Sequence, residues 1–243
     1  MRVLLIAAPF LLLWAPPAIA EMPYVVQQSV LEAGTRATAE LYSAMGTREV
    51  RALGAQGVET GARLRLGLGA ATIEATGARI DGARSGWTGG VEVLTRVVDS
   101  QRAGVDLDLA AGVRRDGLGA LVPRARVVVG RTWGRLNTQV SALAERPLAS
   151  HRDALDVVLG AGAAWRLTPF ASVGVEALAE DVEGFWDASE AEGGVHALVG
   201  PVVRLRWGRT SLSALVAATR GSAIVGAPAS TGGLARLGVG LAF

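Results

Sequence analysis

Residues 235–243 read Ala-Arg-Leu-Gly-Val-Gly-Leu-Ala-Phe, and this stretch shows the pattern that decides the fold. In an extended chain, successive side chains point to opposite faces. One face carries Ala235, Leu237, Val239, Leu241 and Phe243, and the other carries Arg236, Gly238, Gly240 and Ala242. A helix would need apolar residues at every third or fourth position, so this alternation predicts a β-strand.

The same alternation recurs along most of the chain. Each run has about ten residues, which suits a tilted membrane-spanning strand of about 9–11 residues better than a soluble strand of about five or six. We therefore expect an all-β fold, an antiparallel up-and-down transmembrane β-barrel of about 12 strands, with 10 as the alternative count. The runs lie near 35–44, 58–67, 70–79, 88–98, 104–114, 123–133, 136–145, 153–165, 170–180, 194–207, 210–219 and 232–243.

The connections between the runs predict how the barrel is oriented. Every second connection is short, as at Gly67–Gly69, Trp133–Arg135 and Trp207–Arg209, whereas connections such as Gly46–Gly57 and Asp181–Gly193 are longer and polar. Short turns alternating with long loops, with an even strand count, are typical of outer-membrane barrels whose termini lie in the periplasm.

Aromatic residues gather where the runs meet the short turns. These residues are Trp133, Trp165, Phe170, Trp207 and Phe243, whereas Tyr42 and Trp87 fall at the opposite end. Because amphipathic rings favour the boundary between water and lipid, we expect a periplasmic girdle and a sparser outer one.

The amino terminus predicts export. Arg2 precedes an apolar stretch from Val3 to Trp14, and Ala18-Ile19-Ala20 resembles a cleavage site with small residues, so residues 1–20 are expected to be a cleaved signal peptide. A membrane anchor is the alternative, but the apolar run is short and ends at Pro16-Pro17. We expect residues 21–34 to form a short periplasmic segment and residues 35–243 to form the barrel.

The alternating Leu237, Val239, Leu241 and Phe243 also resemble the carboxyl-terminal assembly signal of Gram-negative outer-membrane β-barrel proteins. This resemblance implies an outer-membrane location and recognition of the last strand by the barrel-assembly machinery. It does not choose among the pores, enzymes and adhesins of that superfamily. A soluble secreted β-sandwich is the competing architecture, but it would not need strands this long.

Composition excludes several kinds of chemistry. The 243 residues include no cysteine, and all 24 basic residues are arginine. Disulfides, thiolate zinc sites and lysine Schiff bases are therefore excluded. A net charge of +2 does not suggest nucleic-acid binding, and no cofactor is predicted.

The polar faces of the runs would line the lumen. Both charge signs occur there, which favours either a polar channel or an interior filled by ion pairs. The principal lumen-lining candidates are Asp106, Asp108, Asp156, Glu176, Arg204, Arg206 and Arg236. We expect a passive pore for small solutes. The alternative is a non-transporting structural or surface-binding barrel that contacts lipopolysaccharide, calcium or a partner protein.

Two groups in the outer connections suggest ligands. An acidic loop contains Glu180, Asp181, Glu183, Asp187, Glu190 and Glu192, whose oxygens suit calcium, although the spacing is not that of an EF-hand. Arginines of the outer rim suit the phosphates of lipopolysaccharide, and they are Arg48, Arg51, Arg84, Arg115, Arg146, Arg152 and Arg220.

A hydrolase is the least favoured function. The candidate bases are His151 and His196, and a carboxylate–histidine pair of His196 with Glu190 or Glu192 is conceivable. Neither histidine has the serine spacing of barrel deacylases or phospholipases, so no catalytic residue is assigned and the protein is expected not to be an enzyme.

Overall fold

The computed structural model describes residues 30–31, 35–46, 57–82, 85–149, 155–182, 195–222 and 230–243. Twelve strands and one short helix make up the described elements. The strands are β1 (Ala37–Gly46), β2 (Gly57–Leu68), β3 (Ala71–Gly82), β4 (Gly86–Val98), β5 (Asp106–Arg115), β6 (Leu121–Trp133), β7 (Leu136–Glu145), β8 (Asp156–Thr168), β9 (Ala171–Glu180), β10 (Val195–Trp207), β11 (Thr210–Ser222) and β12 (Ser230–Ala242).

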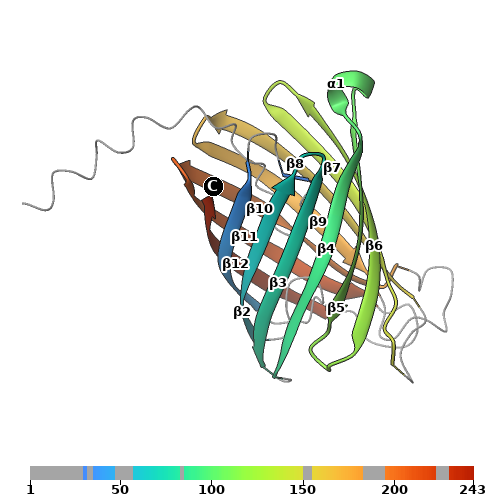
Figure 1. Ribbon diagram of the computed structural model, residues 1–243. Helices are drawn as coiled ribbons and strands as arrows, with labels where there is room; N and C mark the ends of the chain where they lie inside the picture. The colour runs from blue at the N-terminus through green and yellow to red at the C-terminus, as the bar shows by residue number, and fades with distance from the viewer. Residues whose placement is uncertain are drawn as a thin grey trace, which may run out of the picture.

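Each strand pairs with its neighbours in sequence, and β1 pairs with β12, so the sheet closes into a barrel (Figure 1). All pairs are antiparallel, which confirms the predicted up-and-down barrel of twelve strands and excludes the count of ten. Closure leaves no free sheet edge, a requirement for strands surrounded by lipid. Among the described residues, no helix combines the length and apolar character needed to cross a membrane.

The two ends of the barrel differ in their connections. We call the end with the tight turns the short-turn end; there, helix α1 (Ser100–Ala103) connects β4 to β5 (Figure 1). Two of the tight turns repeat the sequence Trp-Gly-Arg, at 133–135 and 207–209. Gly134 and Gly208 each have φ of 58°, a left-handed conformation that favours glycine. We call the opposite end, which carries most of the longer connections, the long-loop end.

The barrel closes at a seam between β1 and β12. Thr38 pairs with Ala242 and Met45 with Ala235, so the register extends along the whole of β1. The terminal Phe243 continues the ladder, since its carbonyl accepts hydrogen bonds from the amides of Arg36 (2.9 Å) and Ala37 (3.3 Å). The last residue therefore takes part in holding the two ends of the sheet together.

Alternation along each strand separates two chemical surfaces. On β12, Leu237 and Val239 are more than half exposed on the outer face, whereas Arg236 between Ala235 and Leu237 is only 2% exposed. On β2, Leu64 and Leu66 point outward and Arg65 is buried. The wall is therefore apolar outside and carries its charges inside.

Candidate functional site

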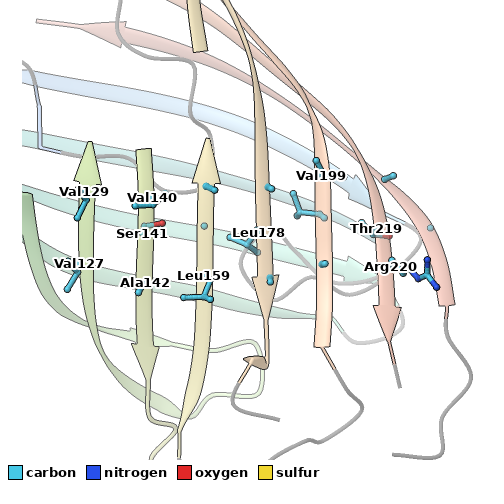
Figure 2. A pocket seen from close by; sticks show the side chains of 18 of the residues that line it. Val127, Val129, Val140, Ser141, Ala142, Leu159, Leu178, Val199, Thr219 and Arg220 are labelled. Atoms are coloured by element: carbon cyan, nitrogen blue, oxygen red, sulfur yellow. The ribbon is translucent and has the colours of Figure 1, made fainter. Parts of the chain in front are cut away.

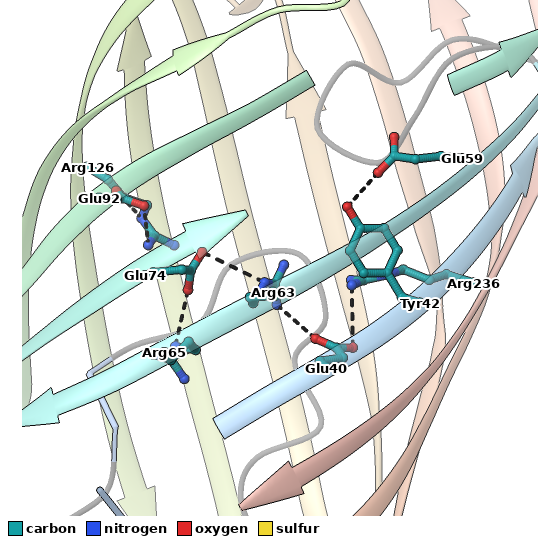
Figure 3. Close-up of polar contacts among 9 residues, drawn as sticks. All are labelled: Glu40, Tyr42, Glu59, Arg63, Arg65, Glu74, Glu92, Arg126 and Arg236. Atoms are coloured by element: carbon teal, nitrogen blue, oxygen red, sulfur yellow. Dashed lines mark hydrogen bonds and ion pairs between the residues drawn. The ribbon is translucent and has the colours of Figure 1, made fainter. Parts of the chain in front are cut away.

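A chain of ion pairs runs along the inner face of β1, β2 and β3 (Figure 3). Arg63 lies between Glu40 (Nη1 to Oε2, 3.5 Å) and Glu74 (Nε to Oε1, 3.8 Å). Glu74 also contacts Arg65, with 3.1 Å between Oε2 and Nε. These side chains are almost fully buried, so each charge depends on its neighbours for the solvation that water would otherwise supply.

Arg236 extends this chain across the seam. Its Nη2 lies 3.4 Å from Oε1 of Glu40, and its guanidinium carbon lies 4.1 Å from the centre of the Tyr42 ring. The Tyr42 hydroxyl donates a hydrogen bond of 2.8 Å to Glu59 (Figure 3). The prediction that Tyr42 lies in an outer aromatic girdle is therefore wrong, because the parity of β1 places its ring inside the barrel.

Further ion pairs follow the inner wall of β4 to β7. Arg126 contacts Glu92 through two hydrogen bonds of 3.1 and 2.9 Å, the bidentate geometry that suits guanidinium and carboxylate. Nearer the long-loop end, Glu145 contacts Arg114 at 2.7 Å and Arg124 at 3.6 Å. The interior is thus crosslinked by charges from successive strands.

Asp108 forms the centre of another cluster near the short-turn end. Its carboxylate accepts hydrogen bonds of 2.8 and 3.2 Å from Arg96, and Asp106 lies 3.5 Å from the same guanidinium. The second contact of Asp108 comes from the amino-terminal segment, because the Val30 amide donates to its Oδ2 at 2.9 Å.

The amino-terminal residues Val30 and Leu31 lie inside the barrel. The Leu31 amide donates to Oγ1 of Thr72 at 3.0 Å, and the Val30 side chain packs with Leu94 and Ala110 of the inner wall. Both residues are only 6% exposed. The sequence predicts a short periplasmic segment over residues 21–34. The two of these residues that the structure describes lie within the barrel, where the inner wall of β3–β5 offers them apolar and hydrogen-bonding contacts.

The structure places the remaining lumen-lining candidates on the same inner face. Asp156, Glu176 and Arg204 are buried, and Arg206 is half-buried. Arg204 and Arg206 stand opposite Ser213 and Ser211 of β11 in the strand register. They are therefore close to the charged group on β1 and β2, across the seam.

Sequence reasoning missed two contributors to this interior, Glu40 and Glu145. Their position could have been found from strand parity, since Leu41 and Met45 mark the outer face of β1 and leave Glu40 on the inner one.

The inner wall also carries an aliphatic region that the sequence did not predict. It lies on β7–β12, mainly toward the long-loop end, and its members pack together with little exposure. They are Leu143, Val158, Leu178, Leu198, Val202, Leu215, Ala217 and Leu234. The interior is thus charged near the short-turn end and partly apolar toward the long-loop end.

A large apolar groove lies along β6–β12 (Figure 2). Its volume is about 990 Å³, and many of its lining side chains, such as Val127, Val140 and Val199, point away from the charged interior. A hollow with these walls suits hydrocarbon chains rather than polar solutes. It is therefore not a candidate for a solute path.

The predicted aromatic girdle residues are exposed at the short-turn end. Trp133 and Trp165 are each 47% exposed and Trp207 is 50% exposed, and Phe170 and Phe243 are more so. Arg131 lies over the Trp133 ring, 4.9 Å from its centre. Their position at a water–lipid boundary remains a prediction.

The acidic loop is described only at its beginning. Glu180 and Asp181 are buried, whereas Glu183, Asp187, Glu190 and Glu192 lie outside the described residues, as does His151. In the described part of the chain, no group of three or more His, Asp or Glu residues could hold a metal ion. The calcium site remains a prediction.

His196 lies at the start of β10, where the strand register places it opposite Glu180 of β9 and Gly221 of β11. Its predicted partners Glu190 and Glu192 lie outside the described residues.

Comparison with solved structures identifies the fold. The chain matches a structure of KdgM porin in complex with disordered oligogalacturonate with a TM-score of 0.61 and 9% sequence identity, over 85% of this chain and 99% of the other. A second KdgM porin structure matches with a TM-score of 0.60, 9% identity and the same coverage. The chain shares the fold of KdgM porin. No protein-family model matches the sequence, and no curated protein is similar to it.

Proposed function

We propose that this protein is an outer-membrane channel that admits small polar solutes. The observation that carries the proposal is the opposite chemistry of the two faces of a closed barrel. Leu64 and Leu66 point outward from β2 while Arg63 and Arg65 point inward, and β12 repeats this division with Leu237 and Val239 outside and Arg236 inside. Such a wall suits lipid on one side and water with polar solutes on the other. The fold shared with KdgM porin supports the same conclusion.

The proposed orientation places the short-turn end and both termini in the periplasm. Trp133, Trp165 and Trp207 would then lie at the inner lipid boundary, which suits their half-exposed rings. The long-loop end would face lipopolysaccharide, with arginines of the rim near its phosphates. The carboxyl-terminal strand would be the part that the barrel-assembly machinery recognises. Export by a cleaved signal peptide of residues 1–20 belongs to the same proposal.

We further propose that the amino-terminal segment narrows the channel at its periplasmic end. Val30 and Leu31 contact the inner wall of β3, β4 and β5, where each of their amides is hydrogen-bonded. Solutes would pass beside this segment or displace it.

A non-transporting barrel is the second candidate. The buried ion pairs that link Arg63, Glu74 and Arg126 with their neighbours support it, because crosslinked side chains occupy space in the lumen.

Planar-bilayer recording distinguishes these two functions. The purified full chain, with folding verified by heat-modifiable migration in a gel, is expected to produce reproducible ion-conducting steps. A folded barrel that remains silent would refute the channel and favour the non-transporting alternative. Membrane fractionation tests the shared premise, which recovery of the protein as a soluble periplasmic species would overturn.

A further inference from the structure

Arginines from two distant parts of the sequence flank a shallow trough on the inner wall near the short-turn end. The strand register aligns β2, β1, β12, β11 and β10 across the seam. One row of facing residues is Arg63, Glu40, Gly240, Ser211 and Arg206, and the next is Gly61, Tyr42, Gly238, Ser213 and Arg204. Both rows have an arginine of β10 at one edge. At the other edge, Arg63 of β2 ends the first row and Gly61 ends the second.

A polar cavity of about 30 Å³ lies in this trough. Five arginines line it, and Glu40 is the single acidic residue among the lining residues that are described. The arginines are Arg63, Arg65, Arg204, Arg206 and Arg209. Glu74, which does not line the cavity, pairs with Arg63 and Arg65, so Glu40 and Glu74 together balance part of this positive charge. The guanidinium groups stay charged at any usable pH. The potential in the cavity therefore favours a negative ligand.

The floor of the trough is built from small residues that keep it open. A Cβ atom at Gly240 would lie 2.7 Å from the Ser211 hydroxyl, and one at Gly238 would lie 2.7 Å from the Ser213 hydroxyl. Either contact is too close for a real side chain. Glycine at both positions therefore leaves room for the serine hydroxyls, and at Gly238 also for the Glu40 carboxylate, beside the cavity between the arginines.

We propose that this trough binds the oxyanion end of a small solute, a carboxylate or a phosphate. Guanidinium groups match both in shape and charge, and the hydroxyls of Thr38 and Ser211 line the same cavity and supply further hydrogen-bond donors. The cavity has the volume of about one water molecule, so it takes the oxygen-bearing end while the rest of the solute stays in the lumen. A role in transport rests on the proposed channel function, whereas binding itself does not.

The binding test is equilibrium dialysis of the folded barrel in detergent against radiolabelled inorganic phosphate. Native protein is expected to bind phosphate, and the double variant Arg204→Gln/Arg206→Gln is expected to bind it about tenfold or more weakly, since each charge-assisted contact contributes strongly. Arg79→Gln is the matched control, because Arg79 is exposed and paired with Asp81 near the long-loop end. It removes one guanidinium charge outside the trough, against two in the double variant, and is expected to leave binding unchanged.

A second variant keeps the net charge. Gly240→Ala places a methyl group on the floor and is expected to weaken phosphate binding while all arginines remain. Acetate is then added as a competitor, with uncharged acetamide as its control. Displacement of phosphate by acetate would show that the site also binds carboxylates, and no displacement would restrict the site to phosphate.

Three results would overturn the proposal: no phosphate binding by the folded native barrel, equal binding by the native and trough variants, or an equal loss in Arg79→Gln. Phosphate binding by a barrel that is silent in planar bilayers would leave the site standing and remove the channel. Ion-conducting steps without phosphate binding would support the channel and remove the proposed site.

Discussion

Replacing Val30 and Leu31 together by glycine is expected to increase the conductance of the proposed channel. Both side chains are 6% exposed inside the barrel, and the segment is further held by the amide contacts to Asp108 and Thr72. The substitution removes the apolar contacts but leaves the backbone able to form the same hydrogen bonds. It therefore isolates what the two side chains contribute to the position of the segment.

The expected effect can be worked out from burial. Full burial of a valine or leucine side chain stabilises by about 1.5–3 kcal/mol, so loss of both side chains costs roughly 3–6 kcal/mol. Because 1.4 kcal/mol corresponds to a factor of ten, the ratio of seated to released segment should fall by at least about 100-fold.

Single-channel recording in planar bilayers measures this change as larger or more frequent open steps. Leu118→Gly is a control, since Leu118 is 63% exposed in the turn between β5 and β6 and contributes no interior contact of this kind. Conductance identical to that of the native protein in the double glycine variant would refute the reasoning.

A locked variant tests the same contact in the opposite direction. The native chain has no cysteine, so cysteines placed at Val30 and Ala110, which pack in one cluster, can form only the intended disulfide within the barrel. The oxidised variant is expected to conduct less than native protein, and a reductant should restore the current. An oxidised, crosslinked variant with native conductance would count against a narrowing role for the segment.

Arg236→Met is expected to destabilise the barrel by roughly 3 kcal/mol, measured by urea unfolding. This is the low end of the effect of breaking a buried ion pair, because Glu40 keeps its contact with Arg63. An unchanged unfolding midpoint would contradict this prediction. Val175→Arg, on the outer face in the middle of β9, should cost about 2–4 kcal/mol in lipid vesicles, and Val175→Leu should be near neutral. Equal stability of these two variants would argue against a lipid-facing wall. Deleting Phe243 should lower the yield of folded barrel in membranes, because its carbonyl and amide hydrogen-bond β1 at the seam; a native yield would show that the seam closes without it.

Much of this fold follows from local sequence pattern. Alternation over 235–243 predicted that Leu237 and Val239 face outward and Arg236 inward, which the structure bears out. This succeeds because the period of a strand is two, so each residue's face depends only on its neighbours in sequence. The prediction for Tyr42 was wrong for a related reason. Its aromatic ring suggested a position at the lipid boundary, but Tyr42 lies two positions from Glu40 on β1 and therefore shares its inner face.

Only the closed barrel decided which residues face one another across neighbouring strands. Alternation gives no register across strands, so it could not show that Asp108 pairs with Arg96 or that Arg236 meets Glu40. Pairing of β1 with β12 brings the arginines of β2 and β10 to the two sides of one trough, although more than 130 positions separate them in sequence.

The sequence by itself therefore determined an apolar wall with a charged interior, because each strand records that division in its own residues. The tertiary structure decided which charges meet, and that Val30 and Leu31 sit among them. Those contacts join residues far apart in the chain, and they exist only once the sheet has twisted, curved and closed on itself.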